Sequence, residues 1–483
     1  MNASALDSGP AILEREIASF SIDSREVLAG SLFFALSQPD YRNNGFNGDF
    51  EDASRYIPDA FQKGAAACIA RKDRYQEHIG LLGEFSDRIF LVDDAIAALQ
   101  GLARRVYQEW GGPVVAITGS AGKTTAKELT ALVLASTGRR VLKNIRNYNN
   151  GLGHPLTVLN LANDKKYDVA VLEMGMSTPM NEIARLCSIT PPDIAVELNV
   201  LPVHLEHLGS IENIARAKAE LIEGMKPGGT AVLNADDPHV AAMAKLHDGP
   251  LIKYGLEEPA DVYARDVEMK EFGRATFTLH TPAGESSVIF ALNGRHNVLN
   301  ALAASAVGHC FGMNAAQIAE ALSKAASPAQ RGEILKFKAG FTVINDSYNS
   351  NPDALLSMVR TLAEGADAVE RKIVAAGEML ELGVDSAAIH RDTGRRIAEC
   401  GIDMLIGIRG NAAELIEGAK EGGINQAVFV ADSAAAGILL ADEIRNGDCV
   451  LVKGSRGVRT EKVIEKLLEK FELEGEAGKA HSE

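Results

Sequence analysis

Short apolar runs that end in a polar residue recur through the middle of the chain. Three of them span residues 114–117, 169–172 and 194–196, and a Gly-Gly-Pro break at 111–113 precedes the first. A short apolar run between turn signals is typical of a strand that is buried on both faces. Because helical segments separate these strands, the pattern predicts a mostly parallel sheet covered on both faces.

A second alternating series occupies the C-terminal part of the chain. It predicts an independent α/β domain of the doubly wound, Rossmann-like kind. The series contains no GxGxxG turn, so a bound dinucleotide is not expected. Its apolar runs lie at residues 341–344, 372–375, 404–406, 428–430 and 449–452.

Near the N-terminus, two apolar runs flank a polar stretch that is rich in Asn and Gly. The runs are residues 31–36 and 65–70, and the stretch is 38–52. This pattern predicts a small α/β domain with one long loop. A chain of 483 residues has room for about three domains. We expect an N-terminal, a central and a C-terminal domain followed by a frayed tail, with bounds 1–108, 109–328, 329–473 and 474–483.

Composition and charge narrow the classes of function. Hydrophobic residues make up 46% of the chain and charged residues 24%, as in ordinary globular proteins. The net charge of −16 argues against nucleic acid as the main partner, because phosphate backbones select basic surfaces. No apolar run is long enough to span a membrane, and the first residues lack the basic and apolar regions of a secretory signal. We therefore expect a cytoplasmic protein without membrane insertion.

The segment after the first central strand has the parts of a phosphate-binding loop. Residues 118–125 read Thr-Gly-Ser-Ala-Gly-Lys-Thr-Thr and lead directly into a helical pattern. Glycines let backbone N–H groups approach phosphates, and the helix N-terminus adds positive potential. Lys123 can reach the β- and γ-phosphates, and Thr124 can bind Mg²⁺. The spacing is GxxGKT, because Ile117 stands where the common pattern has its first glycine; an ordinary strand-to-helix turn is the alternative.

A lysine lies on the apolar stripe of a helix predicted from Ser210 onward. Lys218 is four residues after Ile214 and four before Ile222. One interpretation is a snorkelling stem or an ion pair with Glu206 or Glu220. The other is a neutral lysine that captures CO₂, because a carbamate presents two oxygens and can hold a hard cation such as Mg²⁺.

Two residues are candidate partners of Lys218. Glu173 ends a strand at the edge where ligand sites of parallel sheets collect, and His204 lies in a loop before the lysine helix. Each alone is more often an ordinary helix cap or an exposed loop residue. The hypothesis of a metal site therefore depends on the three residues together.

Taken in order, the motifs of the chain resemble those of the Mur ligases. The resemblance extends over nearly the whole chain and is strongest to the member that adds D-alanyl-D-alanine. The segments that carry it are residues 23–25, 30–36, 118–125, 147–155, 173–175, 204–210, 217–221, 294–300, 346–352, 377–383 and 452–456.

This resemblance implies three domains: a UDP-substrate domain, a P-loop-type ATPase domain and a Rossmann-like ligase domain. It implies ATP-dependent ligation of D-Ala-D-Ala to UDP-MurNAc-tripeptide through an acyl phosphate, by a protein expected to be a monomer. ATP, two Mg²⁺ ions and a CO₂-derived carbamate on Lys218 would take part. The residues implied as catalytic are Lys123, His204 and Lys218.

The resemblance also assigns binding residues. The metal ligands would be Thr124, Glu173, His204 and carbamylated Lys218. Substrate binding would use Ser24, Arg25, Asn147, Asn149, Asn150, Tyr348, Asn349 and Asn351. ATP binding would use Gly119, Ser120, Ala121, Gly122, Lys123, Thr124, Thr125, Asn297, Asn300, Arg331 and Asp346.

Three departures from the family pattern and two alternatives remain. Glu378 stands where the family has Asp, and residues 47–50 lack the His of the family's compact Gly-His-Asp-Phe run. The run 201–203 before His204 is also unusual, although His204 itself is kept. One alternative is a sibling ligase that adds a single amino acid, against which the run 346–352 argues. The other is a non-catalytic regulatory homologue that keeps the nucleotide site.

Overall fold

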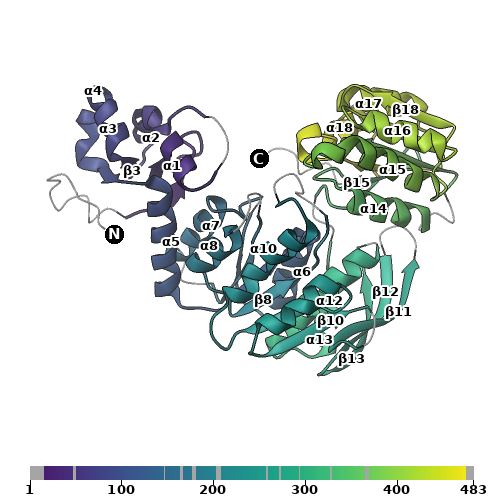
Figure 1. Cartoon of the computed structure of the whole chain (residues 1–483), viewed down its shortest axis with the longest axis horizontal. Coiled ribbons are helices and arrows are strands. Elements are labelled where there is room, and N and C mark those ends of the chain that lie inside the picture. The colour runs from purple at the N-terminus through teal and green to yellow at the C-terminus, as the bar shows by residue number, and fades with distance from the viewer. Residues whose placement is uncertain are drawn as a thin grey trace. The chain divides into compact units, whose positions relative to one another are not determined.

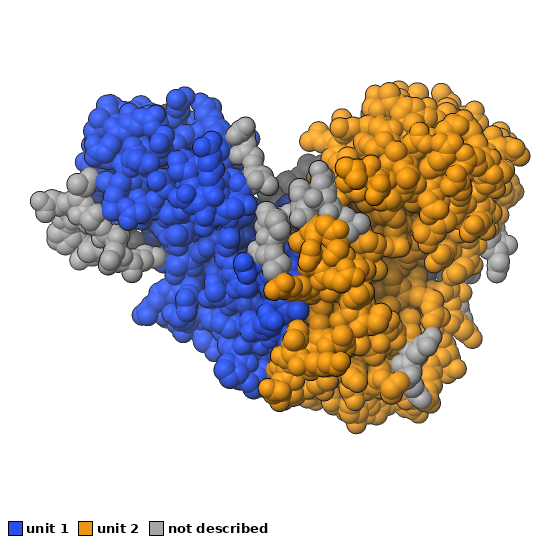
Figure 2. Space-filling view, in the orientation of Figure 1, with its two compact units in different colours: residues 1–118, 138–195, 217–229 blue, residues 119–137, 196–216, 230–483 orange. Residues whose placement is uncertain are grey.

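The strands of the chain form three sheets. The computed structural model describes residues 16–46, 50–145, 147–163, 167–176, 181–202, 208–256, 259–270, 274–292, 294–326, 329–364 and 369–474. By its internal contacts the chain divides into two compact units, coloured separately in Figure 2. Unit 1 holds residues 1–118, 138–195 and 217–229, and unit 2 holds 119–137, 196–216 and 230–483.

The N-terminal sheet is parallel and has four strands in the order β1-β2-β3-β4. Alternate side chains of β2 enter different cores: Leu32 and Phe34 pack with the long helix α5, and Phe33 packs with α2. The elements are β1 (Ser19–Ser21), β2 (Ser31–Ala35), α1 (Gln38–Asn43), α2 (Ile57–Gln62), β3 (Ala67–Arg71), α3 (Lys72–Glu77), α4 (Ile79–Leu82), β4 (Ile89–Val92) and α5 (Ala95–Trp110).

The prediction of one long loop over residues 38–52 is wrong in its first part, because α1 begins there. Ser37 caps this helix, and the carboxylate of Asp40 accepts hydrogen bonds from the Ser37 backbone N–H (2.9 Å) and hydroxyl (2.6 Å). Such a capping box, together with Pro39 in the first turn, starts a helix in a polar sequence. Residues 47–49 lie outside the described residues.

The central sheet has nine strands in the order β13-β12-β11-β10-β9-β8-β5-β7-β6. The predicted strands at 114–117, 169–172 and 194–196 are confirmed. The antiparallel strands β11, β12 and β13 extend the parallel part and were not predicted. The strands are β5 (Val114–Thr118), β6 (Val141–Lys143), β7 (Val169–Glu173), β8 (Ile194–Glu197), β9 (Thr230–Asn234), β10 (Leu251–Gly255), β11 (Val262–Lys270), β12 (Arg274–Thr281) and β13 (Gly284–Phe290).

The helices of the central part of the chain start directly after polar turn segments of the sequence. The first of them starts at Lys123, directly after the glycine-rich loop. They are α6 (Lys123–Ala135), α7 (Gly153–Asn163), α8 (Glu182–Ile189), α10 (Ile211–Glu223), α11 (Pro238–Ala242), α12 (Arg295–Cys310) and α13 (Ala315–Leu322).

The C-terminal sheet, drawn in green to yellow in Figure 1, has the order β14-β15-β19-β16-β17-β18. All of its strands are parallel except β14, and all five predicted strands are confirmed. The elements are β14 (Glu333–Lys336), β15 (Thr342–Asp346), α14 (Pro352–Glu364), β16 (Arg371–Gly377), α15 (Ser386–Ala398), β17 (Met404–Ile408), α16 (Ala412–Glu421), β18 (Gln426–Val430), α17 (Ser433–Glu443), β19 (Asp448–Lys453) and α18 (Glu461–Lys470).

The order of these strands creates a topological switch point. Helices α14, α15 and α16 pack in one core of this sheet, whereas α17 and α18 pack in the other. The segments after β15 and β16 therefore lead to one face, and the segment after β19, which lies between them, leads to the other. Ligands of open α/β sheets bind at the carboxyl ends of strands at such a point. The ends of β15, β19 and β16 are thus the place to look for function.

Two further observations complete the fold. None of the helices in the described part of the chain is long and apolar enough to cross a membrane. The backbone N–H of Glu474 donates to the Lys336 carbonyl over 2.8 Å, and residues 475–483 lie outside the described range.

Candidate functional site

The glycine-rich loop is held in place by a residue that the sequence did not single out. Asn199, just after β8, accepts a hydrogen bond from the Ala121 backbone N–H at its Oδ1 (2.8 Å). Its Nδ2 donates to the Ala121 carbonyl (3.1 Å), and its own carbonyl accepts from the Ser120 N–H (2.9 Å). One asparagine thus holds three successive peptide groups of the loop, which preorganises it before any ligand binds.

Lys123 folds back over this loop. Its Nζ donates to the carbonyl of Gly119 over 2.8 Å and to that of Ser120 over 3.4 Å. The ammonium group therefore lies at the loop and at the N-terminus of α6, where positive potential favours an anion. Thr124 is half-buried, while Thr125 is buried, so Thr124 is the better placed of the two hydroxyls for a ligand.

The predicted asparagines of α12 lie against the loop. A Cβ added to Gly122, whose φ is +83°, would lie 2.5 Å from Asn300 Oδ1. Asn300 Nδ2 donates to Asn297 Oδ1 over 3.3 Å, and both side chains are buried. Directly before Asn297 in the sequence, His296 has its Nδ1 3.2 Å from the Ser357 hydroxyl, and burial lowers the pKa of His296 to about 4. The structure thus brings the loop at Gly122 and the start of α12 at Asn300 together.

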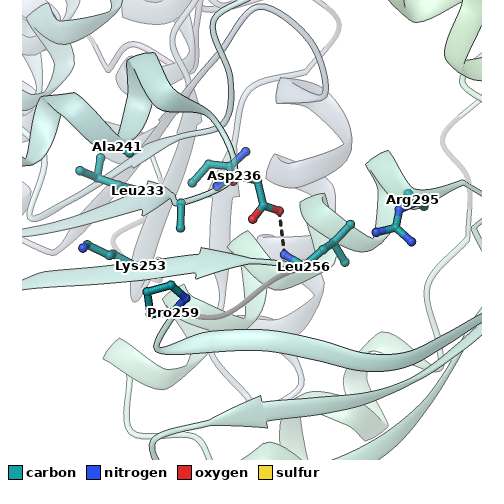
Figure 3. A pocket seen from close by; sticks show the side chains of 9 residues that line it. Leu233, Asp236, Ala241, Lys253, Leu256, Pro259 and Arg295 are labelled. Atoms are coloured by element: carbon teal, nitrogen blue, oxygen red, sulfur yellow. Dashed lines mark hydrogen bonds between the residues drawn. The ribbon is translucent and has the colours of Figure 1, made fainter.

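A pocket of about 450 Å³ opens beside the start of α12 (Figure 3). The carboxylate of Asp236 accepts the Leu256 backbone N–H over 2.7 Å, and Lys253 of β10 and Arg295 of α12 supply two cations. Apart from Arg295, which lies in the motif segment 294–300, none of these residues was predicted, because they come from segments with no motif of their own. The lining residues are Leu233, Asn234, Ala235, Asp236, Ala241, Lys253, Leu256, Pro259 and Arg295.

Glu173 in unit 1 is a buried carboxylate with a fixed orientation. It ends β7 and pairs in register with Ile117 of β5, so it stands at the strand edge from which the loop departs. Asn149 Nδ2 donates to Glu173 Oε1 over 2.8 Å. Asn144, which the sequence did not single out, accepts the Glu173 N–H (2.8 Å) and donates to the Glu173 carbonyl (3.0 Å).

The other predicted residues of this segment have different surroundings. The Oδ1 of Asn150 accepts the backbone N–H groups of Leu152 (3.1 Å) and Gly153 (2.9 Å), so this side chain supports the turn into α7. Asn147 is exposed. Of the three predicted asparagines, Asn149 is therefore the one whose side chain reaches the carboxylate.

Lys218 is buried on α10, as its position on the apolar stripe predicts, with 2% of its surface exposed. Glu220, a suggested ion-pair partner, uses both carboxylate oxygens at the start of α8: they accept the N–H groups of Asn181 (2.6 Å) and Ala184 (3.1 Å). His204 and Glu206 lie outside the described residues. Within the described residues, no group of three or more His, Cys, Asp and Glu could hold a metal ion.

The predicted C-terminal residues meet at the switch point. Lys453 Nζ lies 2.5 Å from Asp346 Oδ2 and donates to the Asn349 carbonyl over 2.9 Å. The Arg331 guanidinium lies 4.1 Å from the ring centroid of Tyr348, a cation–π contact. Asn351 Oδ1 accepts the Ala354 N–H over 2.8 Å and so caps α14. The ends of β15 and β19 are therefore held together by an ion pair between buried Lys453 and half-buried Asp346.

The two predicted residues of the first domain are accessible. Arg25 Nη2 lies 2.6 Å from Asp23 Oδ2, and the hydrogen bond from its guanidinium lowers the pKa of the Asp23 carboxyl. The Ser24 carbonyl accepts a hydrogen bond from Lys63 Nζ over 2.9 Å. The arrangement leaves the guanidinium exposed, with 86% of the Arg25 side chain accessible.

A phosphate-binding loop on a parallel sheet, buried asparagines beside it and a second doubly wound sheet define a nucleotide-binding α/β protein. Comparison with known proteins narrows this class. The Mur ligase middle domain matches residues 117–308, and the Mur ligase glutamate ligase domain matches residues 330–456. The chain belongs to the Mur ligase family.

Individual relatives and structures are similar over nearly the full length. A UDP-N-acetylmuramoyl-tripeptide–D-alanyl-D-alanine ligase of Mycobacterium bovis is 36% identical over 476 residues, which cover 91% of this chain and 90% of the relative. A crystal structure of MurF from Acinetobacter baumannii aligns with a TM-score of 0.81 at 28% identity and 94% coverage of both chains. MurF from Thermotoga maritima, in complex with ADP, aligns with a TM-score of 0.80 at 29% identity, covering 95% of this chain and 98% of that one.

Proposed function

We propose that this chain joins D-alanyl-D-alanine to UDP-MurNAc-tripeptide, with ATP converted to ADP and phosphate. The observation that carries the proposal is the similarity over 91% of the chain to a ligase named for that reaction. The phosphate-binding loop, with Asn199 and Asn300 packed on it, supports the use of ATP. The product, UDP-MurNAc-pentapeptide, is a precursor of peptidoglycan and thereby serves cell shape and division.

The reaction proceeds in two steps. The γ-phosphoryl group of ATP passes to the C-terminal carboxylate of the tripeptide and gives an acyl phosphate. The free amine of D-alanyl-D-alanine then attacks the acyl carbon, the new amide bond forms and phosphate leaves. Phosphoryl transfer depends on positioning and charge neutralisation more than on covalent chemistry from the protein.

The residues of the proposed nucleotide site have separate tasks in this reaction. Lys123, already at the loop, neutralises the triphosphate, and the N-terminus of α6 adds positive potential beside it. Asn297 and Asn300 hold the adenine end, and the pocket beside Arg295 offers space next to them. Arg331 and Asp346 close over the nucleotide from the C-terminal domain and exclude water, which would hydrolyse the acyl phosphate.

The oxygen atoms of the proposed metal ligands are of the kind that Mg²⁺ prefers. The carboxylate of Glu173 and the hydroxyl of Thr124 are hard oxygen ligands, and a carbamate on Lys218 would add two more. The burial of Lys218 supports carbamylation, because a desolvated lysine is neutral and nucleophilic. His204 would complete the set. Bound Mg²⁺ would neutralise the charge of the phosphates and of the acceptor carboxylate.

The remaining predicted residues are assigned to the two other substrates. Tyr348, Asn349 and Asn351 would seat D-alanyl-D-alanine, which their common place at the switch point supports. Ser24 and Arg25 of the first domain, with the 147–150 segment, would contact the UDP-sugar peptide. We keep the domain bounds 1–108, 109–328 and 329–473, a cytoplasmic location and a monomeric state as parts of the proposal.

The experiment that tests this function is an acceptor-dependent assay of phosphate release. The purified chain is supplied with Mg·ATP and UDP-MurNAc-tripeptide, and D-alanyl-D-alanine is compared with single amino acids. We expect phosphate release only with the dipeptide. Release with a single amino acid would indicate a sibling ligase, and ATP binding without release under any combination would indicate a non-catalytic homologue.

A further inference from the structure

His390 on α15 is fully buried, and its neighbours assign both of its ring nitrogens. Nδ1 lies 2.7 Å from the Ser386 carbonyl oxygen, which can only accept, so Nδ1 carries a hydrogen. Nε2 lies 2.9 Å from the backbone nitrogen of Met379, which can only donate, so Nε2 presents its lone pair. The ring is therefore neutral in one tautomer. Burial lowers the pKa of His390, in agreement with this assignment.

The bond to His390 is one of three that fix the segment after β16, residues 378–380. Its three successive backbone N–H groups reach three different elements. The N–H of Glu378 donates to the Ile408 carbonyl of β17 over 2.9 Å, that of Met379 donates to His390, and that of Leu380 donates to Ser455 Oγ over 3.0 Å. Without the imidazole, the N–H of Met379 would lose its acceptor in a place where the residue is 1% exposed.

The side-chain carboxylate of Glu378, the residue that departs from the family pattern, also takes part in a hydrogen bond to the backbone. Its Oε1 accepts the Asn411 backbone N–H over 2.9 Å at the start of α16. A Cβ on Gly410 would come within 2.2 Å of the same oxygen, so the carboxylate is packed tightly there. The segment 378–380 is thus a fixed support, because all three of its backbone N–H groups have acceptors.

This support leads to the predicted dipeptide residues. Ser455 Oγ, which receives the Leu380 N–H, donates its own hydrogen to the Ser350 carbonyl over 3.2 Å. Ser350 stands between Asn349 and Asn351, and the Asn349 carbonyl is held by Lys453 Nζ. A continuous series of hydrogen bonds therefore runs from His390 through residues 378–380 and Ser455 to the segment after β15.

We propose that His390 is a positioning residue for the acceptor dipeptide: its Nε2 lone pair fixes residues 378–380 and, through Ser455, the segment 349–351. This inference rests on the proposed function, because it takes D-alanyl-D-alanine as the ligand of that segment. Asp346 and Lys453 hold each other directly at the strand ends, so the nucleotide side does not depend on the imidazole. The dipeptide and ATP should therefore respond differently to its loss.

The test compares three variants in the full-length protein. His390→Leu removes the acceptor, and His390→Gln offers an amide oxygen in its place. The matched control is Thr393→Val on the same helix: Thr393 is also buried, and its hydroxyl donates to the Ile389 carbonyl of its own helix (2.7 Å), away from residues 378–380. KM is measured for D-alanyl-D-alanine and for ATP, and exchange of the Met379 amide hydrogen is measured by NMR or mass spectrometry.

We expect His390→Leu to raise the KM for D-alanyl-D-alanine about tenfold, as the loss of one buried hydrogen bond implies. The KM for ATP should change less than about twofold, and Met379 exchange should accelerate about tenfold. His390→Gln should recover most of both effects, and Thr393→Val should show neither. If His390→Leu does not fold, His390→Asn, whose shorter side chain leaves the Met379 N–H without its acceptor, replaces it.

Two results would overturn the inference. One is an unchanged KM for the dipeptide in a folded His390 variant whose Met379 exchange is accelerated. The other is an equal change of both KM values in the His390 variants and in Thr393→Val, which would show a purely structural role. A wild-type protein that releases no phosphate with D-alanyl-D-alanine would instead refute the proposed function, and Met379 exchange would still report whether His390 holds residues 378–380.

Discussion

Gly122 is the residue of the phosphate-binding loop whose replacement gives the sharpest prediction. Its φ of +83° lies in the left-handed region, and an added Cβ would lie 2.5 Å from Asn300 Oδ1. An L-residue in this region costs ~1–2 kcal/mol, and forcing a methyl group into a packed contact costs a further ~1–3 kcal/mol. In Gly122→Ala the free loop will relax away from this conformation, and ATP binding must restore it.

The cost of restoring the loop therefore appears in the affinity for ATP. A penalty of about 2–5 kcal/mol corresponds to a Kd that is roughly 30- to 4,000-fold higher, since 1.4 kcal/mol is a factor of ten. Isothermal titration of Mg·ATP into Gly122→Ala and wild type measures this directly. Both proteins should keep the secondary structure seen by circular dichroism.

Gly138 provides a matched control, because its φ is +84° and nothing lies within 4 Å of an added Cβ. Gly138→Ala carries the same backbone strain without the contact and outside the loop. It should lower the melting temperature and leave the Kd for ATP unchanged. If Gly122→Ala binds ATP within about threefold of wild type, or if both variants weaken binding equally, the role assigned to the Gly122–Asn300 contact is wrong.

Two further predictions concern the buried lysines. Lys218→Ala should abolish dipeptide-dependent phosphate release; bicarbonate should not restore it, whereas a short carboxylic acid should restore a part, because it supplies the two oxygens of the missing carbamate. A carbamate resonance in the ¹³C NMR spectrum of ¹³CO₂-equilibrated wild type is the independent measurement, and near-normal turnover of Lys218→Ala would exclude the carbamate. Lys453→Met should lower the free energy of unfolding by about 3 kcal/mol, because it leaves the Asp346 carboxylate, whose side chain is only 15% exposed, without its cation. Asp346→Asn in the same chain should recover most of this loss in calorimetry or denaturant titration, and a lone Lys453→Met as stable as wild type would contradict the reasoning.

Local patterns determined the parts of this protein that depend on residues close together in the sequence. The strands of the parallel sheets follow from short apolar runs, because burial on both faces needs apolar side chains on both faces. The phosphate-binding loop follows from glycines, Lys123 and Thr124 within one turn. The burial of Lys218 follows from helical spacing alone, which places it between Ile214 and Ile222.

The polar stretch at 38–52 shows where a local pattern was interpreted incorrectly. Its composition predicts a loop, yet α1 forms there because Ser37 and Asp40 close a capping box and Asp40 also accepts the Ala95 N–H of α5 over 2.9 Å. A partner 55 residues away stabilises the element. A different reason applies to β11, β12 and β13: they pair with strands next to them in the sequence, and the alternation of buried and less buried side chains along β12 was not recognised.

The candidate site shows the same division. The sequence predicted which residues would carry the chemistry: Lys123, Glu173, Lys218, Asn297 and Asn300. Only the tertiary structure decided what holds the candidate site in place. Asn199, just after β8, holds the loop, and Asn144, just after β6, holds Glu173. His390 on α15 holds the segment 378–380. A single asparagine or histidine carries no motif, because its role comes from a hydrogen-bond partner that the fold brings to it. The sequence by itself thus determined the chemical groups of this protein, and the fold determined their orientation.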